Sequence, residues 1–265
     1  MTETSTVVYV ARSDARRTVL RALAAEPRRG DGLVSALELS KSGVYKAING
    51  LRDRRLLAQK EGDVWDLTAL GRLVTDELDR HRWLEGLFAN REYWLTHDVS
   101  TLPGRFRRRL PELRNADLLS NPDNDPRYLE RYWAERMPEY DRLWVGSRVF
   151  HSTYGDAMDD QAAASGATRL IVHAPLVDQR SAAVAVYEER RPAAVDTRVC
   201  ELPCSFMLTE DLFTLSLPLP DGGYDQDTVL VGGDEAALRF GADLFGFYWE
   251  RAAPVGAYLA EIADG

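Results

Sequence analysis

Hydrophobic residues recur at helical spacing through the first sixty positions. A helix is expected over residues 13–25, capped by Ser13, and a shorter one over residues 33–39. Ser40 then precedes a third helix, because its hydroxyl can accept from the free amides of the first turn. The apolar face of this third helix consists of Val44, Ala47, Ile48 and Leu51. The pattern predicts helix, short helix, turn and helix, with a polar outer face on the last one.

A β-hairpin is expected directly after the third helix. Two short strand-like runs flank a turn at Glu61, Gly62 and Asp63, and residues 58–68 alternate as hairpin strands do. Another helix is expected from Thr68, running through Leu78 and on to Trp94. From about residue 80 aromatic residues, acids and turn signals replace the compact pattern. We therefore expect a first domain over 1–80, a linker helix over 81–100 and a second domain over 101–265.

The second domain shows alternating strand and helix signals. Helices are expected over 104–114 with a break at Pro111, over 126–143 with Asp125 as its cap, and over 154–165, 178–191 and 234–251. Strands are expected over 144–150, 168–173, 196–202, 206–209, 212–217 and 228–231. The predicted fold class is α/β, or α+β for the whole chain.

Composition narrows the possible classes of protein. The 265 residues are 45% hydrophobic and 28% charged, as in soluble globular proteins, and no apolar run approaches the roughly eighteen residues of a membrane span. The N-terminus lacks the basic segment and cleavage site of a signal peptide, so we expect a cytoplasmic protein with no membrane partner. Two cysteines supply neither a disulfide framework nor a complete zinc site, and no cofactor or metal is expected.

The net charge of -9 argues at first against a nucleic-acid partner. The distribution reverses this, since residues 1–80 hold 14 basic and 12 acidic residues (+2) and residues 81–265 hold 19 and 30 (-11). Between Ser40 and Lys60 there are six basic residues and a single acid, Asp53, and all three lysines of the chain lie there. This segment is a local basic patch on an acidic protein.

The patch and the predicted third helix together indicate double-stranded DNA as a partner. The major groove admits one helix whose outward side chains carry hydrogen-bonding groups. The side chains best placed for bases are Ser42, Tyr45, Lys46 and Asn49, and those expected at the DNA backbone are Ser40, Lys41, Arg52, Arg54 and Arg55. Lys60, in the hairpin, could reach flanking phosphates or the minor groove, although Glu61 and Asp63 would be repelled there. The alternative is an ordinary three-helix domain with a solvated polar face and a hairpin that takes part in a protein interface.

Residues 13–75 resemble the winged helix-turn-helix of archaeal transcriptional regulators. Three later segments, 94–103, 217–225 and 237–248, resemble the sensor half of FilR-type regulators, which are related to the methanogenesis regulators. The resemblance implies a DNA-binding repressor or activator, usually dimeric, with a domain that senses an effector. It implies no particular ligand.

The second domain also has the alternating strands and helices of phospholipase-D-like sensor domains, and a catalytic function would require the residues of phosphodiester chemistry. The His-x-Lys pair of phosphodiester chemistry is absent at His81, His97, His151 and His173. A nucleophile elbow and a phosphate-binding loop are also absent from the sequence. We therefore expect no enzyme. The alternatives are a degenerate hydrolase and an adaptor whose winged helix binds protein.

Effector-binding candidates lie where predicted strands end. His151 and His173 close two strands, and with Arg148 they could offer positive charge to an anionic metabolite. His97 and Asp98 are adjacent and are expected to end a helix rather than share a ligand. Cys200 and Cys204 are expected to be buried thiols, with a redox switch as the alternative.

A homodimer is expected because regulators that read two half-sites need matching symmetry. The predicted seam consists of two aromatic stripes: Trp83, Phe88, Tyr93 and Trp94 in one helix, and Phe240, Phe245, Phe247, Tyr248 and Trp249 in another.

Overall fold

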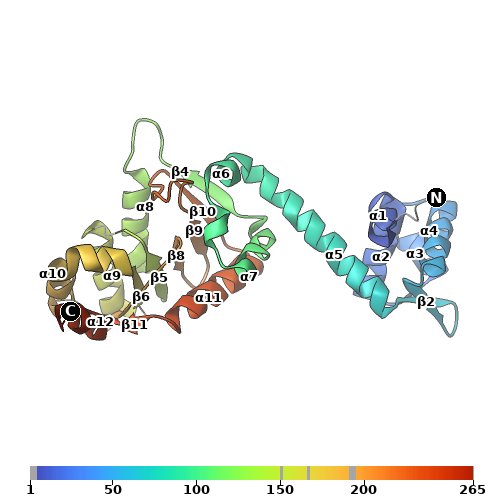
Figure 1. The fold of residues 1–265 in the computed structure, drawn as a ribbon. Helices are drawn as coiled ribbons and strands as arrows, with labels where there is room; N and C mark the ends of the chain where they lie inside the picture. Colours follow the sequence, from blue (N-terminus) through green and yellow to red (C-terminus); the bar gives the residue numbers. More distant parts are fainter. Residues whose placement is uncertain (1–4, 150–151, 166–167, 191–194, 265) are drawn as a thin grey trace. The chain divides into compact units, whose positions relative to one another are not determined.

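Two compact units make up the chain, Met1–Glu85 and Gly86–Gly265. The computed structural model describes residues 5–149, 152–165, 168–190 and 195–264. Figure 1 shows helices and strands in both units, so the fold is mixed α and β.

The N-terminal unit surrounds a small core with helices and a hairpin (Figure 1). Its helices are α1 (Thr6–Ala11), α2 (Asp14–Ala25), α3 (Gly30–Ala36), α4 (Lys41–Asp53) and α5 (Ala69–Gly86). The three-stranded sheet has the order β1-β3-β2, formed by β1 (Arg28–Arg29), β2 (Leu57–Lys60) and β3 (Val64–Leu67). The core is built mainly from Val19, Leu20, Leu23, Leu33, Val44, Ile48 and Leu51. The three expected helices and the hairpin are present.

Two glycines allow the hairpin to turn and to pack against α5. Gly62 has a φ of 74°, a left-handed conformation that glycine adopts without strain, and it lies at the tip of the turn. Gly71, in the first turn of α5, packs so closely that a Cβ there would lie 2.1 Å from the carbonyl oxygen of Leu56. This close approach lets α5 pack directly against the start of the hairpin.

Two expectations for this region were wrong. Ser13 precedes α2 but its side chain forms no capping hydrogen bond. The linker helix does not continue to Trp94: α5 ends at Gly86, and η1 (Leu87–Asn90) and α6 (Arg91–Thr96) follow. Asn90 breaks the helix because its backbone is non-helical (φ -108°, ψ 40°) while its amide donates to the carbonyl of Ala116 at 2.7 Å.

An eight-stranded sheet forms the centre of the C-terminal unit. Its order is β11-β7-β6-β5-β8-β9-β10-β4. The strands are β4 (Asp117–Ser120), β5 (Leu143–Ser147), β6 (Thr168–His173), β7 (Val195–Cys200), β8 (Ser205–Leu208), β9 (Phe213–Ser216), β10 (Thr228–Gly232) and β11 (Ala253–Pro254). β5, β6 and β7 are parallel, and the other neighbours pair antiparallel.

Helices cover both faces of this sheet (Figure 1). On one face lie α8 (Tyr128–Arg136), η4 (Met137–Glu139), α9 (Ser152–Ser165), α10 (Ala174–Arg190) and α12 (Val255–Asp264). On the other lie α11 (Glu235–Trp249) and the segment with η2 (Val99–Thr101), α7 (Gly104–Arg107) and η3 (Leu110–Leu113). Each face has its own hydrophobic core, so the unit is a three-layer sandwich.

The prolines shorten two expected helices. The 104–114 helix is split into α7 and η3, because Pro111 has no N–H to continue the helical ladder. The 126–143 helix ends at Arg136 and continues as η4, because Pro138 has no N–H to extend the helical ladder, and Leu143 already begins β5. Asp125 does not cap α8; its carboxylate pairs with Arg131 instead.

Candidate functional site

Helix α4 separates its apolar and polar residues onto opposite sides. Val44, Ala47, Ile48 and Leu51 are buried in the core of the N-terminal unit. The hydroxyl of Ser40 accepts from the backbone N–H of Gly43 at 3.1 Å, which fixes the first turn as the sequence predicted. The helix therefore presents one polar face to solvent.

The exposed face carries Lys41, Ser42, Lys46 and Asn49. Neither Lys41 nor Lys46 forms an ion pair with a residue that the structure describes. Tyr45 is half-buried, and its ring packs against the start of α3, where a Cβ on Gly30 would lie 3.2 Å from the ring. The two lysines thus keep their charge available, whereas Tyr45 also serves the packing of α3 on α4.

The arginines after α4 have partners within the unit. Arg52 pairs with the neighbouring Asp53 at 3.1 Å. The guanidinium of Arg54 lies 4.0 Å from the ring centre of Tyr9 in α1. Arg55 is exposed in a left-handed conformation (φ 58°), and its carbonyl accepts from the Thr68 hydroxyl at 2.7 Å. Arg52 and Arg55 stay on the surface, while Arg54 also ties the end of α4 to α1.

Lys60 in the hairpin contacts a buried carboxylate that the sequence analysis overlooked. Its ammonium lies 2.5 Å from Asp66, whose other oxygen is 3.2 Å from Arg72 in α5 and also accepts from the N–H of Leu67 at 2.7 Å. The bond from Lys60 is the largest cause that lowers the pKa of Asp66 below its usual range. In the sequence, the signal for this contact was an acidic residue, Asp66, in a strand whose neighbouring side chains are apolar.

The predicted effector residues are hydrogen-bonded to backbone. Arg148 donates to the carbonyls of Pro203 (3.1 Å) and Gly222 (3.3 Å). His173 accepts the N–H of Leu202 through Nδ1 at 3.0 Å, and burial, followed by the charge of Arg148, lowers its pKa. His151 lies outside the described residues. The ligand-binding role of Arg148, His151 and His173 stays a prediction.

A cavity of about 410 Å³ lies elsewhere, between α8 with η4 and the face of β5, β8, β9 and β10; we call it the α8 cavity. Its apolar wall includes Leu129, Trp133, Met137, Val145, Met207 and Val229. Its polar lining includes Asn121, Ser147, Ser205, Thr214, Ser216, Tyr224, Asp225, Gln226 and Thr228. Arg148 and His173 are not among the lining residues. The sequence did contain a signal for this cavity. Hydroxyl residues stand in otherwise apolar strands: Ser205 two positions before Met207 in β8, and Thr214 and Ser216 at alternate positions of β9.

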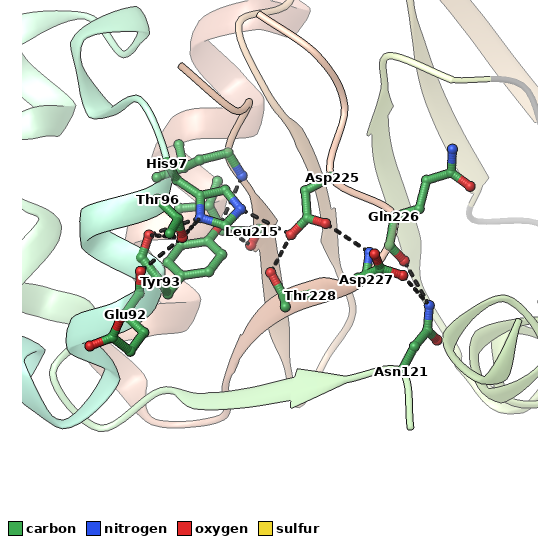
Figure 2. A network of polar contacts seen from close by, with 11 residues as sticks. Glu92, Tyr93, Thr96, His97, Asn121, Leu215, Asp225, Gln226, Asp227 and Thr228 are labelled. Carbon is green, nitrogen blue, oxygen red and sulfur yellow. Dashed lines mark hydrogen bonds and ion pairs between the residues drawn. The ribbon is translucent and has the colours of Figure 1, made fainter. Parts of the chain in front are cut away.

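A buried polar network adjoins the cavity (Figure 2). His97 Nε2 lies 3.0 Å from Asp225 Oδ2, and its Nδ1 lies 2.8 Å from the carbonyl oxygen of Tyr93. Asp225 also accepts from the N–H of Asp227 at 2.8 Å and from the hydroxyl of Thr228. Since Asp98 caps the N–H of Ser100, the adjacent pair His97 and Asp98 does not form one site, as the sequence analysis expected.

Tyr93 closes the same region from α6. Its hydroxyl donates to the carbonyl of Leu215 (3.2 Å) and accepts from the N–H of Leu217 (2.8 Å), and its ring stacks on His97 with 3.9 Å between ring centres. Burial raises the pKa of this phenol. Tyr93 thus supplies both hydrogen bonds that a neighbouring strand would give at the end of β9.

The two cysteines are free thiols, Cys204 buried and Cys200 half-buried. Burial raises the pKa of Cys200 to about 11 and that of Cys204 to about 12. Both thiols are therefore protonated at neutral pH, which disfavours thiolate chemistry.

The aromatic stripes differ in exposure. Tyr93, Phe240, Phe245 and Tyr248 are buried in the C-terminal core, so they are not surface residues that a partner could contact. Phe88 is 58% exposed.

The described ranges hold neither a metal-binding cluster nor a membrane-spanning helix. They hold no group of three His, Cys, Asp or Glu side chains that could bind a metal ion. None of the helices in this part of the chain has the length and apolarity needed to cross a membrane.

Both units match known family models. Residues 4–87 match the HVO_A0261 N-terminal domain, and residues 127–251 match the middle domain of the methanogenesis regulatory protein FilR1. The resemblance to FilR-type regulators is confirmed. The match to the FilR1 middle domain runs from the start of α8 to just past α11, so it includes most of the wall of the α8 cavity.

One curated relative matches along most of the chain. FilR1 of Methanothrix harundinacea (strain 6Ac) is 23% identical over 222 residues, which cover 79% of this chain and 49% of that protein. The chain therefore spans about half the length of this relative.

Two solved structures are similar at low TM-scores. TrmBL2, described as an archaeal chromatin protein with a novel mode of DNA binding, is 13% identical with a TM-score of 0.38, covering 91% of this chain and 94% of that one. The adhesin competence repressor AdcR of Streptococcus pyogenes is 25% identical with a TM-score of 0.26, covering 30% and 63%.

Proposed function

We propose that this chain is a sequence-specific DNA-binding transcription regulator. Its N-terminal unit is a winged helix-turn-helix, with α4 as the recognition helix and the hairpin of β2 and β3 as the wing. The observation that carries the proposal is α4 itself, whose buried face anchors it while Lys41, Lys46 and Asn49 remain exposed on the other. The matches to FilR-type regulators support it.

The proposed DNA contacts keep their division into two kinds. Ser42, Tyr45, Lys46 and Asn49 would read base edges, and Ser40, Lys41, Arg52, Arg54, Arg55 and Lys60 would hold phosphates. Contacts within the unit separate the expected contributions of two phosphate-binding lysines. Lys41 forms no ion pair with the residues that the structure describes, while Lys60 would have to share its charge with Asp66. We expect Lys41 to contribute more than Lys60.

A homodimer would bring two such helices to two half-sites. On α5, Leu70 (56% exposed), Leu73 (65%) and Leu84 (47%) lie on one side of the helix, away from the buried Gly71, Thr75 and Leu78. With Glu77 and His81 they share one face at helical spacing, and we call this set the α5 stripe. Exposed leucines at this spacing are typical of helix pairing.

The α5 stripe is self-complementary when two copies run antiparallel. If Leu73 of one copy lies beside Leu84 of the other, Glu77 of each copy lies opposite Arg80 of the other, and Asp76 lies near His81. Opposite charges would therefore meet in the middle of the pair, with leucines at both ends. This arrangement supports α5 as the dimer seam instead of the aromatic face of α11.

The C-terminal unit would sense a small molecule and would perform no catalytic step. The α8 cavity supports this role, because its volume is within the range of ligand pockets. The phospholipase-D-like fold expected for this unit stays a prediction. A regulator of this kind would act in the cytoplasm, where the DNA is.

Fluorescence anisotropy tests the proposal. The purified chain is titrated onto a duplex from its own upstream DNA and onto a scrambled duplex, at several salt concentrations. We expect tighter binding to the upstream duplex and an affinity that falls steeply as salt rises. A folded protein that binds neither duplex at micromolar concentration and low salt would contradict the proposal, and would favour a winged helix that binds protein.

A further inference from the structure

The α8 cavity is polar on the side of the sheet and apolar on the side of α8 and η4. Ser205 pairs with Ser216 across β8 and β9, and Met207 pairs with Thr214 in the next row. Since alternate side chains of a strand share a face, these hydroxyls lie on the side of the sheet that faces α8. Trp133 and Met137, from α8 and η4, form the opposite wall. A bound molecule would contact hydroxyls on one side and an indole on the other.

Each charged residue that the structure describes in the lining already has a partner within the protein. Arg127 donates to both carboxylate oxygens of Glu130, at 2.9 Å each. Asp225 accepts from His97, Asp227 and Thr228. Among the described residues of the lining, Arg127 is the single cationic one, and Glu130 neutralises it. An anionic ligand would therefore meet no available positive charge from these residues, and would face two carboxylates.

Three polar groups of the walls are hydrogen-bond donors that have no acceptor among the described residues. The hydroxyl of Ser205 accepts from the N–H of Arg148 at 3.0 Å, and that of Thr214 accepts from the N–H of Met207 at 3.1 Å. Neither hydroxyl donates to another residue in the described part of the chain. The indole N–H of Trp133 has no acceptor there either. Three donors without acceptors require an acceptor from the ligand or from water.

We propose that the α8 cavity binds an uncharged organic molecule that presents a carbonyl or similar acceptor oxygen on a planar apolar body. The acceptor would take hydrogen bonds from Ser205, Thr214 or Trp133, and the apolar body would pack between Trp133 and Met207. This ligand class differs from the anionic metabolite that the sequence predicted, because that prediction used Arg148, His151 and His173. The inference rests on the proposed sensing role of the C-terminal unit and is independent of DNA binding.

Three probes of one skeleton separate the charge classes: benzamide, benzoate and benzylamine. Each is titrated into the full chain, and binding is followed by broadening of the ligand's NMR lines. We expect benzamide to bind at least about tenfold more tightly than either charged probe, because burying an unpaired charge is unfavourable. Equal or tighter binding of benzoate or benzylamine, or no binding of benzamide, would overturn the proposal.

Two matched variants locate the binding. Trp133→Phe removes the indole N–H and keeps an aromatic ring, so the Kd of benzamide should rise severalfold. Trp249→Phe makes the same change outside the cavity lining and should leave the Kd unchanged. An unchanged Kd in Trp133→Phe, with the variant folded, would place benzamide elsewhere and refute the site.

Anisotropy on the same samples keeps this test distinct from the proposed function. Benzamide binding that depends on Trp133 supports the cavity even if the chain fails to bind DNA. Conversely, specific DNA binding without benzamide binding would refute the cavity and leave the regulator intact.

Discussion

Lys41 and Asn49 lie on the exposed face of α4, but removing them should change DNA binding in different ways. Lys41→Ala should weaken binding to all duplexes and reduce the slope of log affinity against log salt by about 1, because one phosphate contact releases about one counterion. Anisotropy at four salt concentrations measures this slope. An unchanged slope would show that Lys41 does not contact phosphate and would contradict its assignment.

Asn49→Ala should act on sequence preference. The amide of Asn49 can hydrogen-bond a base edge, so its loss should cost about 1–3 kcal/mol on the specific duplex and little on the scrambled one. The ratio of the two affinities is the measurement. Glu38→Ala, a change of an exposed residue outside α4, is the control and should leave the ratio unaltered. Equal losses on both duplexes would exclude base reading by Asn49.

Asp66 makes the stability of the N-terminal unit depend on pH. Lys60 and Arg72 lower its pKa in the folded state, so the ionised carboxylate stabilises the fold above about pH 4, its unfolded value. This contribution is lost as the pH falls through the lower folded pKa. Asp66→Asn should therefore lower the free energy of unfolding by about 1–3 kcal/mol at pH 7, with a smaller difference at pH 2 to 3.

Thermal unfolding of Asp66→Asn across this pH range checks the sign of the effect. Asp63→Asn, at the exposed tip of the hairpin, is the matched control and should change little. A difference between wild type and Asp66→Asn that grows as the pH falls would refute the assigned role of Asp66.

The cysteines should react slowly with alkylating reagents. Their raised pKa values leave little thiolate at pH 7.5, and Cys204 is buried as well. We expect iodoacetamide to label Cys200 slowly and Cys204 only after unfolding, as followed by mass spectrometry. Rapid labelling of both cysteines in the native protein would contradict this prediction and would favour the alternative of a redox switch.

At the scale of elements, the sequence predicted what local patterns encode. The periodicity of Val44, Ala47, Ile48 and Leu51 gave α4, and Ser40 marked its start correctly. The strand β6 was expected over 168–173 and lies at Thr168–His173. β4, β11 and α12 were not expected: β4 is placed by its pairing with β10, far along the chain, and β11 has two residues. Pairing between distant segments leaves no local period.

The two candidate sites also differ in how far local sequence patterns could predict them. The exposed side of α4 follows from one helical period, so its residues could be named in advance. The α8 cavity requires hydroxyls from four strands and an indole from a helix, and their order in space depends on the sheet topology. Arg148 and His173 were chosen as strand-end residues, but the loop carbonyls and the Leu202 amide that they bind could not be anticipated from the sequence.

The α5 stripe makes a prediction about oligomeric state. Leu73→Glu and Leu84→Glu should each weaken the dimer at least about tenfold, because each would bury a carboxylate against an apolar partner. Light scattering after size-exclusion chromatography measures the mass. Leu95→Glu, also at an exposed leucine (63%), is the control and should leave the mass unchanged.

Charge reversal tests the antiparallel direction of the pair. Glu77→Arg should weaken the dimer, and adding Arg80→Glu should restore part of the loss, since the opposite charges would meet again. A wild-type chain that is monomeric at every concentration would contradict the seam. So would a double variant weaker than both single variants.

At the scale of the whole molecule, the two units have separate hydrophobic cores. We expect calorimetry to show two unfolding transitions. Ile48→Val, in the N-terminal core, should lower one of them by about 4–8 °C and leave the other in place. Val199→Ala, in the C-terminal core, should do the reverse. A single transition that moves with both variants would mean that the units unfold together.

The pairing of β4 with β10 has a consequence during synthesis on the ribosome. The edge strand β4 leaves the exit tunnel about a hundred residues before its partner β10 exists. The N-terminal unit needs nothing beyond α5 and can fold at once, whereas the sheet has to wait with β4 unpaired. For that interval the chain would carry a finished DNA-binding unit and an unfinished sheet with an open strand, the stage at which a chaperone would have most to protect.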